Sequence, residues 1–350
     1  MVTIWQVAAH SRVMTDESLS LNITSPAELV ALIPYWLGYQ PQDALVVLAA
    51  HGGRVELGCA LNADQFDDDE TLDDLAGVLR QRVGDAQLIV VGFGKPEPID
   101  EAVARMEIAL GAERLDSSMV VSGRRFWLRS AGERPLWSAG HEFDPRSSVA
   151  ATTAVSAGLQ ILGSREDVAA LVSGRRATTP AVARAWRAAS IELAGWSATR
   201  RYRALDQLLA RVIGEKAQLS TGEYVELGVL AQDLGLRDRA WLSMDSQRAW
   251  SHEQLWLAVI DVTPRRYAPP VLCLAGVAAW LSGGGAVFTE CLARCEQIDP
   301  DYSMAALLRE IHDRAVPPSL WKRMGASRES RERRCAEAEA GDRSEEASGR

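Results

Sequence analysis

The sequence predicts an α/β (α+β) N-terminal domain with a mixed sheet covered by helices, followed by an all-helical region. Apolar, strand-like runs are confined to about the first 145 residues, where they alternate with helical patterns. Short turns at 51–54 and 122–124 contain glycine and join neighbouring strand-like runs, which indicates antiparallel hairpins. From residue 147 onward the pattern is helical and strand signals almost vanish. We therefore expect domains over 18–145 and 146–322.

The first clear helix start lies at Ser25. Ser25 can cap the helix, Pro26 suits its first position, and Glu28 at the third position completes a capping box. Pro34 lacks an amide proton, so we expect the helix to bend or to stop there. Gly38 can then supply a positive φ at the end of the segment.

The other elements of the N-terminal domain follow from the same patterns. We expect a mobile arm over 1–17, a first strand over 19–23, and a turn over 40–43. Further strands are expected over 44–50, 55–61, 88–93, 119–121 and 125–128, with helices over 72–79 and 99–110. The run 44–50 does not alternate, so it should be buried on both faces of the sheet.

The second domain is expected to be a helical bundle or a short solenoid with tetratricopeptide-like packing. Helices are expected over 149–162, 165–172, 181–213 with a division at Gly195, 224–234, 252–260, 269–282, 286–297 and 302–315. The spacing of Gly276, Gly283, Leu292, Cys295 and Pro300 resembles one tetratricopeptide hairpin, without a second copy. The tail over 323–350 carries seven charges of each sign and no apolar periodicity, so we expect it to be disordered.

Composition limits the class of protein. The 350 residues carry a net charge of -9, and 47% of them are hydrophobic, as in globular proteins. No apolar run reaches the roughly 20 residues that a bilayer span needs, and a secretory signal pattern is missing. Five cysteines at no framework spacing argue against a disulfide scaffold. We therefore expect a cytoplasmic protein that does not bind membranes.

One string near the N-terminus carries a family resemblance. It resembles the opening motif of an uncharacterised, actinobacterial-like group, the domain of unknown function family 4192, through Ser25-Pro26-x-Glu28-Leu29-x-x-x-x-Pro34-Tyr35-x-Leu37-Gly38-Tyr39-x-Pro41-x-Asp43-x-Leu45-Val46-Val47. Weaker similarity at 280–300 and 317–318 extends the expected coverage to residues 18–320. The family pattern includes a Cys-Cys-Pro-Pro-like element, whereas residues 130–144 contain no cysteine. The resemblance implies a family and no activity.

The edge of the predicted sheet is a candidate small-molecule site. The candidate ligand-binding residues are Pro34, Gly38, Asp43, Gly92, Gly94 and Lys95. The last three lie between a strand and a helix, where backbone amides and a lysine could meet an anion, but the rest of a phosphate-loop motif is missing. The alternative hypotheses are a plain strand-to-helix turn there, and a joint that sets the first helix against the sheet in the opening motif.

The helices within 165–216 are a candidate interaction surface because this segment carries ten basic and five acidic residues. The candidate residues are Arg184, Trp186, Arg187, Arg200, Arg201 and Arg203. Such a pattern could present an aromatic and basic face to nucleic acid or to an acidic protein. The alternative is a solvated helix face with one buried tryptophan.

Other side chains give little support for chemistry. Cys291 and Cys295 share a helix face, and Cys273 or His312 could complete a metal site, but a core position suits free thiols better. No nucleophile elbow and no histidine partner spacing is present, so we expect no cofactor and no metal. These observations lean away from an enzyme.

The favoured function is that of a cytoplasmic protein-interaction or regulatory protein, with the helical domain providing the surface. The first alternative is a small-molecule or nucleotide-binding enzyme or sensor that uses the sheet edge. The second is nucleic-acid binding through 165–216, which the acidic charge of the whole chain disfavours. We expect the partner to be another protein, with a small molecule as the alternative.

Overall fold

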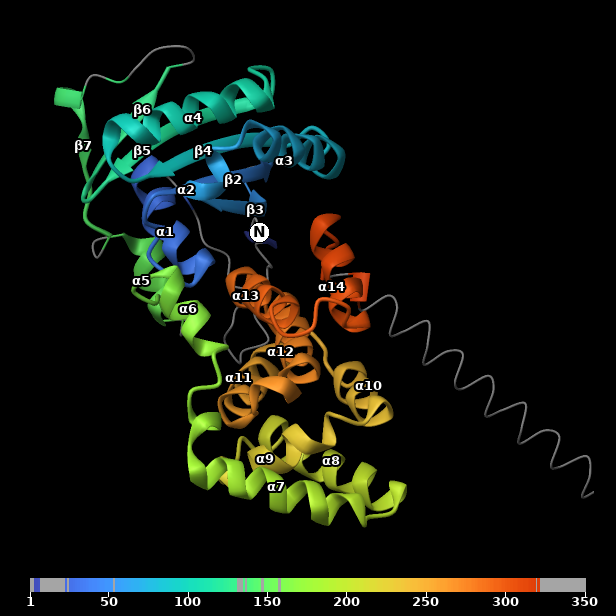
Figure 1. The fold of residues 1–350 in the computed structure, drawn as a ribbon. Coiled ribbons are helices and arrows are strands. Elements are labelled where there is room, and N and C mark those ends of the chain that lie inside the picture. The colour runs from blue at the N-terminus through green and yellow to red at the C-terminus, as the bar shows by residue number, and fades with distance from the viewer. Residues whose placement is uncertain are drawn as a thin grey trace, which may run out of the picture. The chain divides into compact units, whose positions relative to one another are not determined.

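A computed structural model describes most of the chain (Figure 1). The described residues are 3–6, 23, 25–52, 54–130, 135, 137–145, 148–156, 159–318 and 320–321, without the side chains of 3–6, 54 and 138. The chain divides into two units after residue 315, and the first unit contains every helix and strand named below. The boundary expected near residue 145 and the disordered tail over 323–350 stay predictions, and the tail lies outside the described residues.

A mixed sheet occupies the N-terminal part. Its seven strands in the described residues lie in the order β1-β3-β2-β4-β5-β6-β7. The strands are β1 (Thr3–Gln6), β2 (Ala44–His51), β3 (Arg54–Asn62), β4 (Gln87–Phe93), β5 (Leu115–Ser122), β6 (Arg125–Arg129) and β7 (His141–Glu142). Only β4 and β5 pair in parallel, and the other neighbours pair antiparallel. The mixed sheet with two hairpins is therefore confirmed.

The N-terminal arm differs from the prediction where it is described. Thr3–Gln6 form β1, which pairs antiparallel with β3, so the expectation of a mobile arm is wrong for these four residues. A strand this short gives too little periodicity to detect from sequence. The strand expected over 19–23 lies outside the described residues, apart from Ile23, which is not in a strand.

The helix α1 (Pro26–Leu37) begins at the predicted cap and ends at the predicted glycine. The Ser25 hydroxyl accepts a hydrogen bond of 3.3 Å from the amide of Glu28, and Gly38 ends the helix with a φ of 80°. The helix does not stop at Pro34, because it continues to Leu37 and the Gly38 amide donates to the Pro34 carbonyl. A bend at Pro34 stays a prediction. A proline removes only one helical hydrogen bond, and the last turn is held by the burial of Leu37.

Both faces of β2 are buried, as predicted. Leu45 and Val47 belong to one apolar cluster with side chains of α3 (Asp69–Arg82) and α4 (Pro96–Leu110). Val46 and Leu48 point to the other face and are equally buried. Figure 1 shows α3 and α4 on one face of the sheet and α1 on the other. The short α2 (Ala63–Phe66) leads from β3 into α3.

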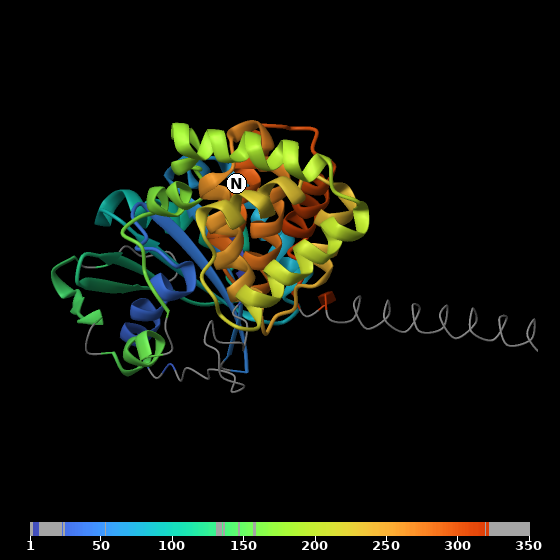
Figure 2. The same cartoon turned by 90° about the horizontal axis from the view of Figure 1, so that it is seen from below.

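The rest of the compact unit is helical, as predicted. Its helices are α5 (Val149–Ser156), α6 (Arg165–Leu171), α7 (Pro180–Ala194), α8 (Ala198–Ile213), α9 (Thr221–Leu230), α10 (Leu234–Leu242), α11 (Ala249–Val262), α12 (Ala268–Ser282), α13 (Gly285–Glu296) and α14 (Ser303–Asp313). α12 is buried on all sides except at Trp280 and Ser282, and packs against α10, α11, α13 and α14. Figure 2 shows the green and yellow α7 to α10 bordering the orange α11 to α13.

Two helices differ from the prediction. The helix expected over 149–162 ends at Ser156, because Leu162 instead pairs with Tyr39 through hydrogen bonds of 2.9 Å to Gly38 and Gln40. The helix expected over 224–234 ends at Leu230, and α10 follows it after an N-cap at Asp233. The tetratricopeptide-like packing of α12 and α13 stays a prediction. In the described part of the chain, no helix has both the length and the apolar character for a bilayer span.

Candidate functional site

The sheet edge brings Asp43 and Gly94 together. β2 begins where β4 ends, since Ala44 pairs with Phe93. A Cβ on Gly94 would lie 2.8 Å from Oδ1 of Asp43, which is exposed and has a φ of 42°. The Gly94 amide donates a hydrogen bond of 3.0 Å to the carbonyl of Val121. Gly94 thus permits a close approach of two loops, and its amide already has a partner.

Gly92 and Lys95 also have local explanations. A Cβ on Gly92 would lie 2.7 Å from side-chain atoms of both Ile99 and Val103, so this glycine lets α4 pack on β4. Lys95 is exposed and precedes α4, whose first and third residues are prolines. Prolines have no amide proton, so this helix start offers fewer donors to an anion than most.

The other two edge candidates belong to the joint between α1 and the chain before α6. Pro34 is buried, and the Gly38 carbonyl accepts the hydrogen bond from Leu162. Tyr39 is only 2% exposed, and burial raises the pKa of its hydroxyl, against the opposing charge of Arg165. Since Pro34 is packed inside and Asp43 is exposed, these residues do not share one binding face.

The predicted interaction residues separate into a core residue and a solvent-facing set. Trp186 is 5% exposed and stacks on Tyr267, with ring centroids 5.4 Å apart. A Cβ on Gly228 would lie 2.6 Å from the Trp186 ring, which shows how closely α9 approaches it. The prediction that Trp186 belongs to an exposed aromatic and basic surface is therefore wrong. Arg184 and Arg187, in contrast, are exposed on α7.

The arginines of α8 differ in their partners. Arg201 forms an ion pair of 3.3 Å with Asp233, and the Arg200 guanidinium lies 3.8 Å from the ring centroid of Trp196. Arg211 is paired with Glu223. Within the described residues, Arg203 has neither an ion pair nor a ring partner. Arg203 is therefore an exposed positive charge without a counter-charge in the described part of the chain.

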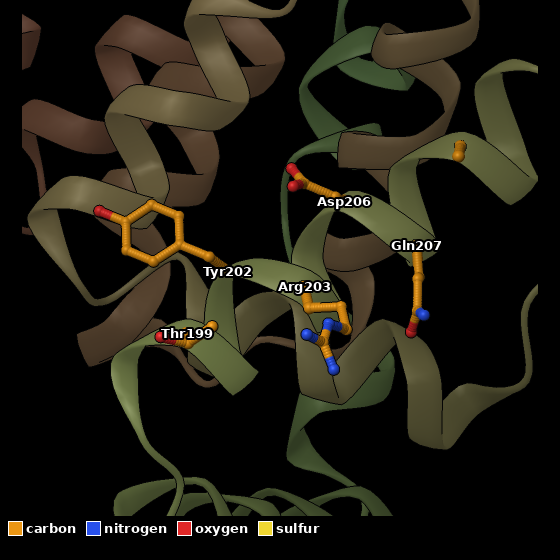
Figure 3. A pocket seen from close by; sticks show the side chains of 6 residues that line it. Thr199, Tyr202, Arg203, Asp206 and Gln207 are labelled. Carbon is orange, nitrogen blue, oxygen red and sulfur yellow. The ribbon is translucent and has the colours of Figure 1, made fainter.

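A surface hollow of about 440 Å³ lies on the exposed face of α8 (Figure 3). It is lined by Thr199, Tyr202, Arg203, Asp206, Gln207 and Ala210. Asp206 is held in two hydrogen bonds, of 2.6 and 2.8 Å, by Arg239 of α10. Sequence reasoning found only Arg203 of this set. The other lining residues recur at intervals of three or four positions, a spacing which indicates in the sequence that they share a face of the helix.

An unpredicted buried charge cluster joins β6 to α4. Arg129 donates to both carboxylate oxygens of Glu107, over 3.0 and 3.2 Å, and also forms an ion pair with Asp100. The side chains of Arg129, Asp100 and Glu107 are 2%, 3% and 10% exposed. The hydroxyl of Ser118 donates to Glu107 as well. This network fixes the position of β6 on the helix that covers the sheet.

The cysteines and histidines give no chemical centre in the residues described. Burial raises the pKa of the Cys59 thiol to about 12 and that of Cys291 above its ordinary range. A hydrogen bond to Cys295, followed by burial, does the same for Cys273. No three metal-binding side chains lie together in this part of the chain. The interpretation of these thiols as core residues therefore fits their surroundings.

His252 is a buried histidine of α11. Burial, and then the charge of Arg248, lowers its pKa to about 4, while Asp245 opposes the shift. Its Nδ1 has no hydrogen-bond partner among the described residues. His252 is thus neutral in the folded protein at neutral pH.

Comparison with known proteins gives a family without an activity. The family model described as "Domain of unknown function (DUF4192)" matches residues 26–319. This range begins one residue after the Ser25 cap and ends after α14. Neither the curated proteins nor the solved structures give a match.

Proposed function

Because the chain belongs to this family of unknown function, we propose its function from the geometry alone: it binds another protein through the exposed faces of α7 and α8. The observation that carries this proposal is the set of solvent-facing arginines on a chain with a net charge of -9. Arg184 and Arg187 lie three residues apart and so share a face of α7. Arg203 lies on α8 and has no counter-charge among the residues that the structure describes.

Exposed apolar side chains beside these arginines favour a protein over a nucleic acid. Ile191 follows Arg187 by one helical turn and is 71% exposed, and Leu234 at the start of α10 is 64% exposed. Arginine with large apolar side chains is typical of protein interfaces. Nucleic-acid binding instead depends on many phosphate contacts, roughly 6 to 10 in strong binders. The unpaired arginines of this surface are fewer than that.

The sheet edge supports a small-molecule site less well. Its glycines are explained by the approach of α4 and of Asp43, and Pro34 is buried.

We also propose a cytoplasmic location, since the four cysteines of the described residues are free, buried thiols.

Capture from a lysate of the source organism tests the proposal. The full chain is compared with the double variant Arg184→Glu and Arg187→Glu. The control is the double variant Arg82→Glu and Lys95→Glu, which makes the same change in charge at exposed positions of the sheet domain. We expect a partner that is retained by the wild type and the control and lost by the α7 variant. The purified partner must then bind the wild type with the same ranking of variants.

Two results would contradict this function. Equal capture by all three proteins would show that the exposed face of α7 does not bind the partner. Loss of capture after nuclease treatment, together with affinity that falls steeply with salt, would indicate nucleic acid instead. Urea unfolding of each variant shows whether a loss of binding reflects a loss of fold.

A further inference from the structure

We infer that the hollow on α8 receives the carboxylate of an aspartate or glutamate side chain that lies next to an apolar residue in the partner protein. This inference rests on the proposed protein interaction and names the chemistry of the segment that is bound. Its support comes from the charge of the hollow, from its donors, and from the apolar side chains at its rim.

The charge of the hollow is positive. It contains one cationic side chain, Arg203, and one anionic side chain, Asp206. Arg239 neutralises Asp206 through two hydrogen bonds, whereas Arg203 has no counter-charge within the described residues. A guanidinium without a partner is best matched by a carboxylate, which it can bind through two parallel hydrogen bonds. The hollow therefore has one unpaired charge to offer to an anionic side chain.

The donors of the hollow lie on one side of α8. Thr199, Arg203 and Gln207 follow one another at intervals of four residues, so they lie along one line of the helix. Figure 3 shows that the side chains of Arg203 and Gln207 extend from α8 in the same direction. The hydroxyl and the amide can each donate a hydrogen bond next to the guanidinium. Thr199 and Gln207 lie about 6 Å along the helix axis to either side of Arg203, so a carboxylate bound by the guanidinium can also accept from at most one of them.

The rim of the hollow is apolar. Tyr202 is 37% exposed, and Ala210 keeps one end of the hollow free of a long side chain. The Tyr202 hydroxyl lies against Gly235, so the exposed Leu234 at the start of α10 is close to this rim. Water that covers such side chains is released when a partner's apolar residue packs on them. The bound segment should therefore carry an apolar residue beside its acidic one.

Binding of a defined peptide to the full chain tests the inference. The probe is a fluorescein-labelled peptide in which pairs of glutamates alternate with pairs of leucines, followed by fluorescence anisotropy. Control peptides carry glutamine in place of glutamate, or serine in place of leucine. We expect each control to bind about tenfold or more weakly than the probe, and the affinity of the probe to fall when salt is added.

Protein variants locate the site. Arg203→Glu should weaken probe binding by about tenfold or more, and Arg203→Lys by less, because lysine keeps the charge but loses the two-pronged hydrogen bond. Arg82→Glu on α3 makes the same charge change away from the hollow and should alter the affinity by less than about twofold. Because Arg203 has no protein partner in the described residues, its replacement should leave the urea unfolding midpoint unchanged.

Several outcomes would overturn the inference. Absence of probe binding at low salt, or equal losses in Arg203→Glu and Arg82→Glu, would show that the hollow does not select a carboxylate. Displacement of the probe by inorganic phosphate, but not by acetate, would indicate a small-anion site. Displacement by a short DNA duplex would indicate nucleic acid. If Arg203→Glu still captures the partner while the Arg184 and Arg187 double variant does not, the proposed function is supported, but the inference that the hollow binds the partner's carboxylate is refuted.

Discussion

Arg129→Met should destabilise the protein by about 3–5 kcal/mol, a large part of the roughly 5–15 kcal/mol that folding usually provides. The reason is that Arg129 is 2% exposed and is the counter-charge of both Asp100 and Glu107, which are 3% and 10% exposed. Methionine fills a similar volume but leaves two carboxylates of like charge without their arginine. Removing one partner of a buried ion cluster costs much more than the cluster contributes as a whole.

The measurement is urea unfolding of the full chain, followed by circular dichroism. The matched control is Arg125→Met in the same strand, because Arg125 pairs with Glu142 at 2.5 Å while both side chains are at least half exposed. An exposed pair of this kind contributes only about 0–1 kcal/mol. The comparison therefore separates burial of the charge from loss of an arginine in β6.

A triple variant tests the reasoning further. Arg129→Met with Asp100→Leu and Glu107→Met removes all three charges, so its cost should be well below the sum of the three single costs. Two results would refute the argument. One is a cost of Arg129→Met no larger than that of Arg125→Met, and the other is a triple cost equal to the sum.

Three further predictions concern stability. Gly92→Ala should lower the free energy of unfolding by about 1–3 kcal/mol, because the new Cβ would overlap two core side chains. Gly77→Ala, on an open part of α3, should instead raise it by about 0.5–1 kcal/mol, and urea unfolding midpoints compare the two variants. Ser25→Ala should cost about 1 kcal/mol by removing the cap of α1, and Ser25→Asp should restore most of it in the same assay. Because the pKa of His252 is lowered from 6.5 to about 4, the unfolded chain binds a proton that the folded one does not. Stability should therefore fall as the pH drops below 6.5, by about 2 kcal/mol at pH 5, and His252→Gln should flatten this dependence; an unchanged slope would contradict the assignment.

Elements with local determinants were predictable from the sequence. The cap at Ser25 and the left-handed Gly38 each depend on a few neighbouring residues, and both are present. The end of α5 was not predictable in the same way. It depends on the pairing of Leu162 with Tyr39, a residue over a hundred positions earlier. A tertiary contact decides where this helix stops.

The candidate surface was predictable only in part. The excess of arginine identified α7 and α8, but the position of Trp186 follows from the apolar stripe that it forms with Val182 and Leu193. That stripe is readable in the sequence and indicates the core. The sequence could not predict which arginine lacks a partner. Arg201 pairs with Asp233, the N-cap of α10, and Asp206 pairs with Arg239 within α10, a helix that the sequence patterns did not predict.

The central position of α12 sets the order in which the helical part can form during synthesis. α12 packs against helices on both sides of it in the chain, and roughly 70 residues separate the end of α8 from its own end. At about 5–20 residues per second, a ribosome needs on the order of 4–14 s to make this stretch. Until then the nascent helices α10 and α11 expose the apolar faces that α12 later covers. A growing chain of this protein should therefore depend on ribosome-associated chaperones most strongly just before residues 268–282 emerge.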